Sequence, residues 1–471
     1  MTQPTDADAL VPYLDRTGLA AHFVGVGGAG MAPLAAIMAE AGWRVSGCDL
    51  SGSAITRQLA ASGIRVARGH DPGHVAGQEL LVISSAVPAD APEVAAARAA
   101  GIPVVKRAQL VGALTRRTRA ICVAGTAGKT TTTAMTAVAL MGAGADPSVL
   151  VGGAVAGVGV GGRAGRGDLL VVESDEYDRS FLNFRPHVAV VTNVEADHLD
   201  CYADLADIQA AFRAFLSAVP ADGATVVCAD DPGALAVAPR GAIAYGESEA
   251  ADWRVRALRP SEAGTEADVE APDGRGVPLR LAVPGRHNVL NAVAALAVCD
   301  VLGADLEAAA AALAEFRGAA RRFELKGVVG GIAVYDDYAH HPTKVRAALA
   351  GARQRARGRV WCLFQPHTFH RTASLWDDFL TAFADADQVV LLDIYSPPGR
   401  EPPMPDVTSG RLAAAMRHPA ARYAQSPDAA LDLIAAETRR GDLVVTMGAG
   451  DVTALGPRLL ERLAARGAVV L

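Results

Sequence analysis

Short apolar segments alternate with alanine-rich helical segments along almost the whole chain, and the alternation restarts twice. Such alternation is typical of βαβ units, in which parallel strands form a sheet and helices cover its faces. A stretch rich in charged residues, Pro and Gly at 250–284 predicts an insertion of short strands in the second unit. We therefore predict an α/β fold of three domains, at residues 1–116, 117–318 and 319–471.

Length, charge and hydropathy agree with this organisation and argue against some partners. The chain has 471 residues, enough for about three domains, and its net charge of −7 comes with no long basic run that would suit nucleic acid. The N-terminal segment is acidic, and no apolar run reaches the ~20 residues needed to span a bilayer. We expect a cytoplasmic protein without a membrane segment, whose six scattered cysteines are reduced thiols.

The segment "AGTAGKTTT" follows an apolar strand and precedes an alanine-rich helix. Gly125 and Gly128 allow the backbone to curl so that its N–H groups point inward. Lys129 can then reach terminal phosphates, Thr130 can offer its hydroxyl to Mg²⁺, and the helix N-terminus faces the same anion. The pattern is shortened, because Val123 stands where a first Gly is usual. A shortened phosphate loop is therefore predicted here in preference to a simple glycine turn.

Two further strands of the second unit end in residues that suit a metal ion. "DLLVVESDE" brings Glu173 to the point where such a strand usually presents a carboxylate to a metal-bound phosphate. "HVAVVTNVEADHLD" delivers His198, with Asp197 and Asp200 nearby. An acidic strand end by itself is most often a solvated loop. Its position after a phosphate loop favours an Mg²⁺ site.

The first unit contains a complete G-x-G-x-x-G pattern at Gly25, Gly27 and Gly30, between a strand and a helix. Asp49 follows at the end of the next strand, as in dinucleotide-binding folds. A nicotinamide-dependent dehydrogenase is one interpretation. The glycines and the helix N-terminus, however, require only a diphosphate.

Two polar clusters lie further along the chain. His287 and Asn291 are four residues apart at the start of a helix, where they either share one binding face or cap the helix. The second cluster, between a strand and a helix that starts with Pro, contains Asp336, Asp337, His340 and His341. Such a density of titratable groups at the carboxyl end of a strand favours a site.

In this order, the motifs resemble those of the Mur ligase family over nearly the whole chain. The matching segments include "HFVGVGGAGM", "GTAGKTTTTAM", "VTNVEADHLD", "GRHNVLNA", "DDYAHHPT" and "FQPHTFHRT". The resemblance implies the three-domain Mur ligase architecture: a Rossmann-like N-terminal domain for UDP, a central P-loop ATPase domain, and a Rossmann-like C-terminal domain. It replaces the nicotinamide with a UDP diphosphate at the glycine loop.

The resemblance also implies a reaction. An ATP-dependent, amide-bond-forming ligase would join L-alanine to the carboxylate of UDP-N-acetylmuramate through an acyl phosphate, with ATP and Mg²⁺ as cofactors, in peptidoglycan precursor synthesis. Two alternatives stay open: a ligase that recycles a whole L-Ala-γ-D-Glu-diaminopimelate tripeptide, and a non-catalytic regulator that binds the UDP-sugar and ATP. A monomer or homodimer is expected, with hinges near residues 112–119 and 317–322.

The resemblance assigns roles residue by residue. The catalytic residues are Lys129, Glu173, His198 and His341, with the base for the amine left open among His341, His340 and Asp337. The metal ligands are Thr130, Glu173 and His198. The cofactor-binding residues are Gly125, Thr126, Gly128, Lys129, Thr130, Thr131, His287, Asn291 and Asp336. The substrate-binding residues are Gly27, Gly28, Gly30, Met31, Asp49, Arg322, His340 and Arg371. Ala127 and Thr368 depart from the family pattern, which has His and often Arg there.

Overall fold

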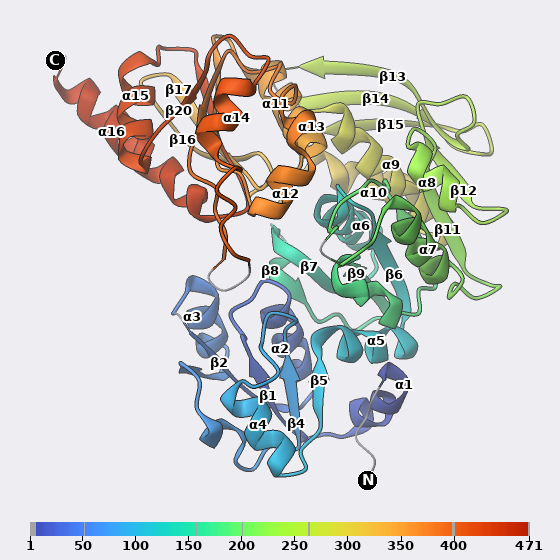
Figure 1. Ribbon diagram of the computed structural model, residues 1–471. Helices are drawn as coiled ribbons and strands as arrows, with labels where there is room; N and C mark the ends of the chain where they lie inside the picture. Colours follow the sequence, from blue (N-terminus) through green and yellow to red (C-terminus); the bar gives the residue numbers. More distant parts are fainter. Residues whose placement is uncertain are drawn as a thin grey trace.

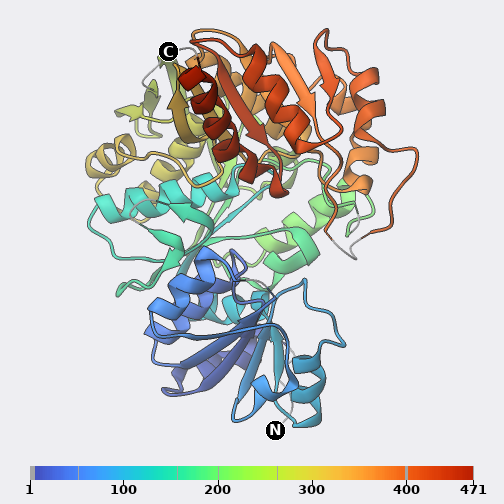
Figure 2. The same ribbon diagram turned by 90° about the vertical axis from the view of Figure 1, so that its left-hand side faces the viewer.

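The chain folds into three successive α/β units, each built on its own sheet (Figures 1 and 2). The computed structural model describes residues 6–50, 52–155, 158–199, 201–261, 264–397 and 401–469. Asp200 lies outside these described residues. The fold class predicted from the strand–helix alternation is confirmed.

The first sheet has the strand order β3-β2-β1-β4-β5, and all its strands are parallel. This is the order of a Rossmann-type sheet: the chain adds strands on one side of β1 and then continues on the other side with β4. Its strands are β1 (Ala20–Val24), β2 (Arg44–Asp49), β3 (Arg65–Arg68), β4 (Leu80–Ile83) and β5 (Val104–Lys106). Its helices are α1 (Ala7–Leu10), η1 (Val11–Asp15), α2 (Met31–Glu40), α3 (Ala54–Ala61), η2 (Pro72–Val75), α4 (Pro92–Ala99) and α5 (Arg107–Arg117).

The central sheet has the order β15-β14-β13-β12-β11-β10-β6-β9-β7-β8, and its middle strands are parallel. Residues 253–281 form an antiparallel ribbon at one edge, which confirms the predicted insertion of short strands. The strands are β6 (Arg119–Ala124), β7 (Ser148–Val155), β8 (Gly159–Arg163), β9 (Leu169–Glu173), β10 (Val188–Val191), β11 (Ala224–Cys228), β12 (Ile243–Gly246), β13 (Trp253–Ser261), β14 (Gly264–Glu270) and β15 (Gly276–Leu281). The helices are α6 (Lys129–Gly142), η3 (Tyr177–Asn183), α7 (Leu205–Leu216), α8 (Pro232–Val237), α9 (Arg286–Val301) and α10 (Leu306–Ala314).

The third sheet has the order β16-β17-β21-β18-β19-β20, parallel except for the edge strand β16. Its strands are β16 (Glu324–Val329), β17 (Ile332–Asp337), β18 (Val360–Phe364), β19 (Gln388–Leu391), β20 (Ala421–Tyr423) and β21 (Leu443–Met447). Its helices are α11 (Pro342–Arg355), α12 (Phe369–Ser374), α13 (Trp376–Phe379), α14 (Ser409–Ala415), α15 (Pro427–Glu437), η4 (Asp451–Ala454) and α16 (Leu455–Val469).

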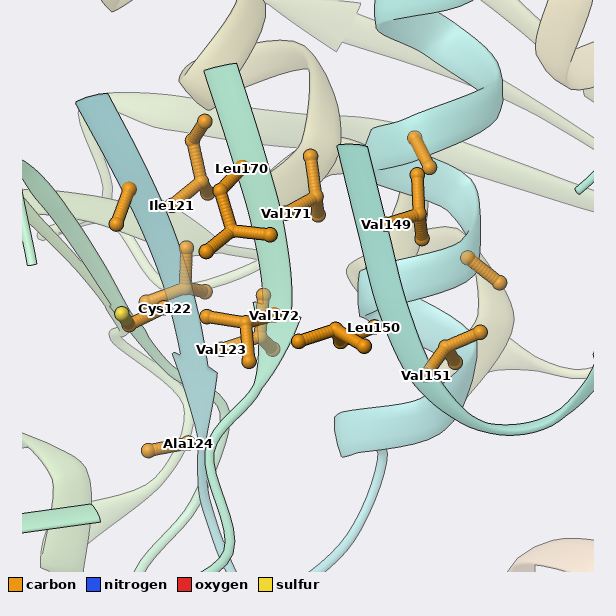
Figure 3. Packing of buried hydrophobic residues seen from close by; sticks show 14 of the residues in the cluster. Ile121, Cys122, Val123, Ala124, Val149, Leu150, Val151, Leu170, Val171 and Val172 are labelled. Carbon is orange, nitrogen blue, oxygen red and sulfur yellow. The ribbon is translucent and has the colours of Figure 1, made fainter. Parts of the chain in front are cut away.

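The core of the central domain explains why its strands are apolar along their whole length. The neighbouring strands β6, β9 and β7 place buried aliphatic side chains on both faces, and α6 runs beside them (Figure 3). Strands of a parallel sheet covered on both sides read as continuous apolar runs rather than alternating ones. Because β6, β9 and β10 are parallel, their carboxyl ends meet at one edge, where polar residues follow each strand.

The first predicted hinge is wrong, because residues 112–117 belong to α5 rather than to a linker. Arg116 and Arg117 lie in the last turn of the helix, where cations are favoured by the helix dipole. Gly112 packs so tightly that an added Cβ would lie 2.4 Å from the carbonyl oxygen of Asn183.

Among the described residues, no helix is long and apolar enough to cross a membrane.

We expect Leu170→Ala to destabilise the central domain by about 2–5 kcal/mol, because it leaves a cavity between β9 and its neighbours. Leu170 is 2% exposed, whereas Leu235 is 45% exposed. Leu235→Ala is the matched control, and we expect it to change the free energy of unfolding by no more than about 0.5 kcal/mol. Urea unfolding followed by circular dichroism measures both variants. Equal effects would contradict this description of the core.

Candidate active site

The phosphate loop joins β6 to α6 and depends on two glycines. Gly125 has φ +139°, and an added Cβ would lie 2.0 Å from the Thr192 hydroxyl oxygen. Gly128 has φ +85° and directly precedes the first residue of α6. Only glycine adopts such backbone angles at little cost. The Ala127 N–H donates to Asn193 Oδ1 at 2.7 Å, and its carbonyl accepts from the Thr192 hydroxyl at 2.6 Å, so both backbone groups of Ala127 are fixed.

The Lys129 ammonium is held between the loop and a buried carboxylate. Its Nζ donates to the Gly125 carbonyl at 2.7 Å and to Glu176 Oε2 at 2.6 Å, and lies 3.7 Å from Asp175 Oδ1. Burial by itself would lower the pKa of Lys129, but the adjacent carboxylates of Glu176 and Asp175 raise it above its usual range. The ammonium is therefore charged and already lies over the loop.

The structure separates the predicted metal ligands into two groups. The Thr130 hydroxyl donates to Glu173 Oε1 at 2.9 Å, and Glu173 Oε2 accepts from the Gly152 N–H at 2.6 Å. His198 instead lies with Asp175 and Glu176, and the ligand atoms of these three residues lie within 4.8 Å of one another.

The group of Asp175, Glu176 and His198 fits a divalent cation. Glu176 Oε1 is buried, and no hydrogen-bond partner for it exists in the described part of the chain. Burial raises the pKa of Glu176 to about 7 and lowers that of His198 to about 4, so the imidazole is neutral and able to bind a metal. Neither Asp175 nor Glu176 was predicted as a ligand, although both lie within three residues of Glu173 in "ESDE".

A cavity of about 190 Å³ lies beside the phosphate loop, between the central and C-terminal domains. His287 and Asn291 from α9 line it, as predicted for one binding face. Asn291 Oδ1 accepts from the Thr132 hydroxyl at 3.0 Å, which ties α9 to α6. Arg322 also lines the cavity, and its Nη2 donates to the Thr130 hydroxyl at 3.1 Å. The other loop residues expected to bind cofactor, Thr126 and Thr131, are buried beside the loop.

The two neighbouring acids of β17 point to different places, because successive residues of a strand face opposite sides. Asp337 lines the cavity, and its carboxylate accepts from the N–H groups of Phe323 and Ala339. Asp336, which was predicted to bind the cofactor, does not line this cavity. Its carboxylate accepts from the hydroxyls of Thr446 and Thr453 at 2.8 and 2.7 Å.

His340 and His341 differ in the freedom of their ring nitrogens. His340 Nδ1 lies 2.8 Å from the Tyr338 carbonyl. His341 caps α11, and its Nδ1 accepts from the Thr343 N–H at 3.3 Å. His341 Nε2 is buried and makes no hydrogen bond to any described residue. Burial lowers the pKa of His341 to about 4, so the ring is neutral near pH 7, with its proton on Nε2 because Nδ1 accepts.

Arg371 from α12 brings the C-terminal domain to the end of β10. Its Nη2 donates to Asp197 Oδ1 at 3.0 Å and lies 3.5 Å from His198 Nδ1. Thr368 and Arg371 line a second, smaller cavity with Asp197 and His198. The predicted contribution of the C-terminal domain therefore reaches the metal-binding group.

The glycine loop of the first domain is assembled as predicted. The Gly27 N–H donates to Asp49 Oδ2 at 3.0 Å, and α2 begins at Met31. Gly30 lies against the Arg107 guanidinium, because a Cβ added at Gly30 would be 3.1 Å from Arg107 Nη1. Burial lowers the pKa of Arg107, and the charges of Asp175 and Glu173 act in the opposite direction. Sequence reasoning missed Arg107. Gly28 completes the turn, because its carbonyl accepts from the N–H groups of Met31 and Ala32.

A phosphate loop at the carboxyl edge of a parallel sheet, with a cation-binding group and a cavity between two domains, defines a P-loop nucleotide-binding protein with two flanking α/β domains. Family models match all three parts: "Mur ligase family, catalytic domain" at residues 20–119, "Mur ligase middle domain" at 123–299, and "Mur ligase, glutamate ligase domain" at 321–450. The chain belongs to the Mur ligase family.

Individual relatives extend over almost the full length. The chain is 47% identical to a UDP-N-acetylmuramate–L-alanine ligase of Paenarthrobacter aurescens, covering 94% of this chain and 96% of that protein. It is 44% identical to the ligase of the same name of Acidobacterium capsulatum, covering 94% and 98%. The crystal structure of a UDP-N-acetylmuramate–alanine ligase from Thermotoga maritima superposes with a TM-score of 0.80 at 29% identity, covering 95% and 100%. A murein peptide ligase from Psychrobacter arcticus gives 0.73 at 26% identity, covering 95% and 99%.

We expect the affinity for ATP to fall with rising pH because of Lys344. Its side chain lines the larger cavity, and its Nζ lies 3.9 Å from Asp197 Oδ2. Burial lowers the pKa of Lys344 to about 8, so the positive charge is present below that pH and lost above it. The value of kcat/KM for ATP, which reports the free enzyme, should fall about tenfold per pH unit above this point.

Lys344→Arg keeps its charge at alkaline pH, so we expect the alkaline fall to move upward by at least about one pH unit. Lys326→Arg is the matched control, since Lys326 lies on the edge strand β16 beside Glu324. An unchanged alkaline limb in Lys344→Arg would show that another group titrates.

Proposed function

We propose that this protein is an ATP-dependent ligase that joins L-alanine to the carboxylate of UDP-N-acetylmuramate, with release of ADP and phosphate. The observation that carries the proposal is the clamped Lys129 ammonium beside a cation-binding group, at a boundary between domains. Full-length relatives with that named activity support the choice of substrates.

The chemistry explains why ATP is needed. A carboxylate repels the lone pair of an attacking amine, and its oxygen is a poor leaving group. Transfer of the γ-phosphoryl group to a carboxylate oxygen, as the bond to ADP breaks, gives an acyl phosphate. The amine of L-alanine then attacks the carbonyl carbon, and inorganic phosphate leaves as the amide forms.

The residues of the phosphate loop suit the first step. The N-terminus of α6 and the Lys129 ammonium would bind the β- and γ-phosphates and stabilise negative charge on the transferred group. Thr130 and Glu173 on one side, and Asp175, Glu176 and His198 on the other, would hold Mg²⁺. When bound, Mg²⁺ neutralises charge on the phosphates.

The residues of the C-terminal domain suit the second step. The attacking amine must lose a proton, and a base must have a free acceptor atom. Asp337 already accepts two backbone N–H groups, and His340 Nδ1 is close to a carbonyl. His340 Nδ1 donates to the Tyr338 carbonyl, which leaves Nε2 of that ring as an acceptor, whereas the neutral His341 ring carries its proton on Nε2 because Nδ1 accepts the Thr343 N–H. The base therefore stays open between His340 and His341. Arg322 and Arg371 would bind anionic parts of the substrates.

The first domain would bind the UDP-sugar. Asp49 holds its glycine loop, and the N-terminus of α2, which follows the loop, would bind the diphosphate. Arg107 lies against this loop at Gly30, where it would meet the same diphosphate. The domain limits at residues 116 and 318 belong to this proposal. A monomer or homodimer is also proposed.

A tripeptide-recycling ligase is the second candidate, favoured by the structural likeness to a murein peptide ligase. It differs only in the amine, so the acceptor decides between the two.

We expect phosphate release from ATP and Mg²⁺ to require both UDP-N-acetylmuramate and L-alanine, with a matching gain in mass of the UDP-sugar. Substituting the L-Ala-γ-D-Glu-diaminopimelate tripeptide for L-alanine is the comparison. Release with the tripeptide alone would assign the recycling activity. Tight binding of both nucleotides without any release would instead indicate a regulator.

We expect Lys129→Ala to lower kcat by about two to three orders of magnitude, the range seen when a donor to developing negative charge is removed. Binding of UDP-N-acetylmuramate, measured by calorimetry, should change little, because its glycine loop lies in the first domain. Lys326→Ala serves as the control for loss of a lysine. A nearly fully active Lys129→Ala enzyme would disprove the assignment of the phosphate loop.

A further inference from the structure

A second group of metal-ligating side chains lies in the first domain, apart from the site described above. It consists of His22 (β1), Cys48 (β2), His70 (after β3), His74 (η2) and Glu93 (first turn of α4), and is called the His-Cys cluster below. The five residues come from five segments of the chain. They meet because β2 lies between β1 and β3 in the sheet, and α4 packs over η2. The proposed ligase reaction uses none of them.

Glu93 is the centre of the His-Cys cluster. Its side chain is fully buried, and Oε1 lies 3.0 Å from His70 Nδ1, 3.2 Å from His74 Nδ1 and 3.3 Å from Cys48 Sγ. Oε1 also accepts the Asp71 N–H at 3.0 Å. Four groups therefore crowd around one carboxylate oxygen.

Two buried atoms of the same cluster are left over. Glu93 Oε2 and His22 Nε2 make no hydrogen bond to any residue that the structure describes. Each belongs to a side chain at least nine-tenths buried. An unpaired buried polar atom costs about 1–3 kcal/mol, so a native protein normally supplies a partner. The crowding at Oε1 and the unpaired atoms beside it are explained together if a cation occupies the cluster.

The spacing of the donor atoms suits a tetrahedral metal ion. The ligand atoms of Cys48, His70 and Glu93 lie within 4.8 Å of one another, and so do those of His22, Cys48 and His74. With metal–ligand distances of roughly 2.0–2.3 Å, neighbouring donors on a tetrahedron are separated by about 3.3–3.7 Å. Cys48 Sγ lies 3.3 Å from Glu93 Oε1 and 3.7 Å from His70 Nδ1, so little movement is required.

We propose that Cys48, His70 and Glu93 bind a divalent transition-metal ion of the Zn²⁺ class, with His74 as the fourth ligand. A thiolate with imidazole nitrogens selects such an ion over Mg²⁺ and Ca²⁺, which prefer all-oxygen ligands. Cys48 binds as the thiolate, and its proton passes to solvent. His22 is a positioning residue: its ring stacks on His74 with centroids 5.2 Å apart, and its Nδ1 lies 2.9 Å from the Ser46 hydroxyl.

The metal would stabilise the end of β2, to which the glycine loop is hydrogen-bonded. The Cys48 carbonyl accepts the N–H groups of Gly25 and Val26 at 2.9 and 3.0 Å. The next residue, Asp49, accepts the Gly27 N–H. A metal bound at Cys48 therefore fixes the backbone to which the loop is attached, so the site has a structural role that does not depend on the ligase reaction.

The test uses the whole protein, stripped of metal with a chelator and titrated with Co²⁺ as a spectroscopic probe. Thiolate ligation gives an intense near-ultraviolet charge-transfer band, which the active-site group of Asp175, Glu176 and His198 cannot give. We expect about one equivalent of Co²⁺ to produce this band, Zn²⁺ to abolish it by displacement, and Zn²⁺ to raise the melting temperature.

Four variants separate the His-Cys cluster from other sites. Cys48→Ser should lose the band and the Zn²⁺-dependent rise in melting temperature, and Glu93→Gln should weaken Zn²⁺ binding at least about tenfold. Cys299→Ala, which removes a buried thiol of α9, is the control and should keep the band. His198→Ala provides a background without the active-site cation group.

Absence of the band in the unmodified protein would overturn the proposal, and so would its persistence in Cys48→Ser. If Cys48→Ser does not fold, Glu93→Gln decides: Zn²⁺ affinity equal to that of the unmodified protein would overturn the site, and a tenfold loss would support it.

Discussion

The buried ion pair between Lys129 and Glu176 is the interaction on which the rest of the site depends. Lys129 begins α6, whereas Glu176 follows β9, so the pair fixes the phosphate loop relative to the neighbouring strand. A buried ammonium without a carboxylate partner would cost several kcal/mol. In the proposed function, a phosphate of ATP would replace Glu176 as the partner of Lys129, and Glu176 would then be available to a cation.

The first and central domains share one continuous cluster of buried hydrophobic residues, whereas polar contacts join the central domain to the C-terminal domain. Gly161 of β8 lies so close to α2 that an added Cβ would be 3.0 Å from the Ala29 carbonyl and 3.2 Å from Pro33. This accounts for the glycine-rich run before residue 163. On the other side, the Thr343 hydroxyl donates to Glu195 Oε2 at 2.6 Å, and Arg371 pairs with Asp197. Polar contacts of this kind re-form with little cost, so they suit domains that must close and reopen around substrates.

Much of this arrangement is predictable from the sequence, because local patterns encode it. The alternation of apolar and helical segments predicts the three sheets, and the glycines with Lys129 identify the phosphate loop. The sequence does not predict strand register, and therefore not which of Asp336 and Asp337 faces the cavity. It also missed Asp175 and Glu176, since an acidic run after a strand is most often solvated. In the structure, Glu176 is buried against Lys129, and both acids lie beside His198.

The His-Cys cluster was invisible to sequence reasoning for a related reason. Its members are spread over about 70 positions, and only the order of β1, β2 and β3 in the sheet brings them together. The same geometry explains how two sites fit at one sheet edge. Successive residues of β2 face opposite sides, so Cys48 points toward Glu93 of α4 while Asp49 holds the glycine loop at Gly27. A metal site on one face and a diphosphate site on the other can then be occupied together. The two sites share the strand between them but have no ligand in common.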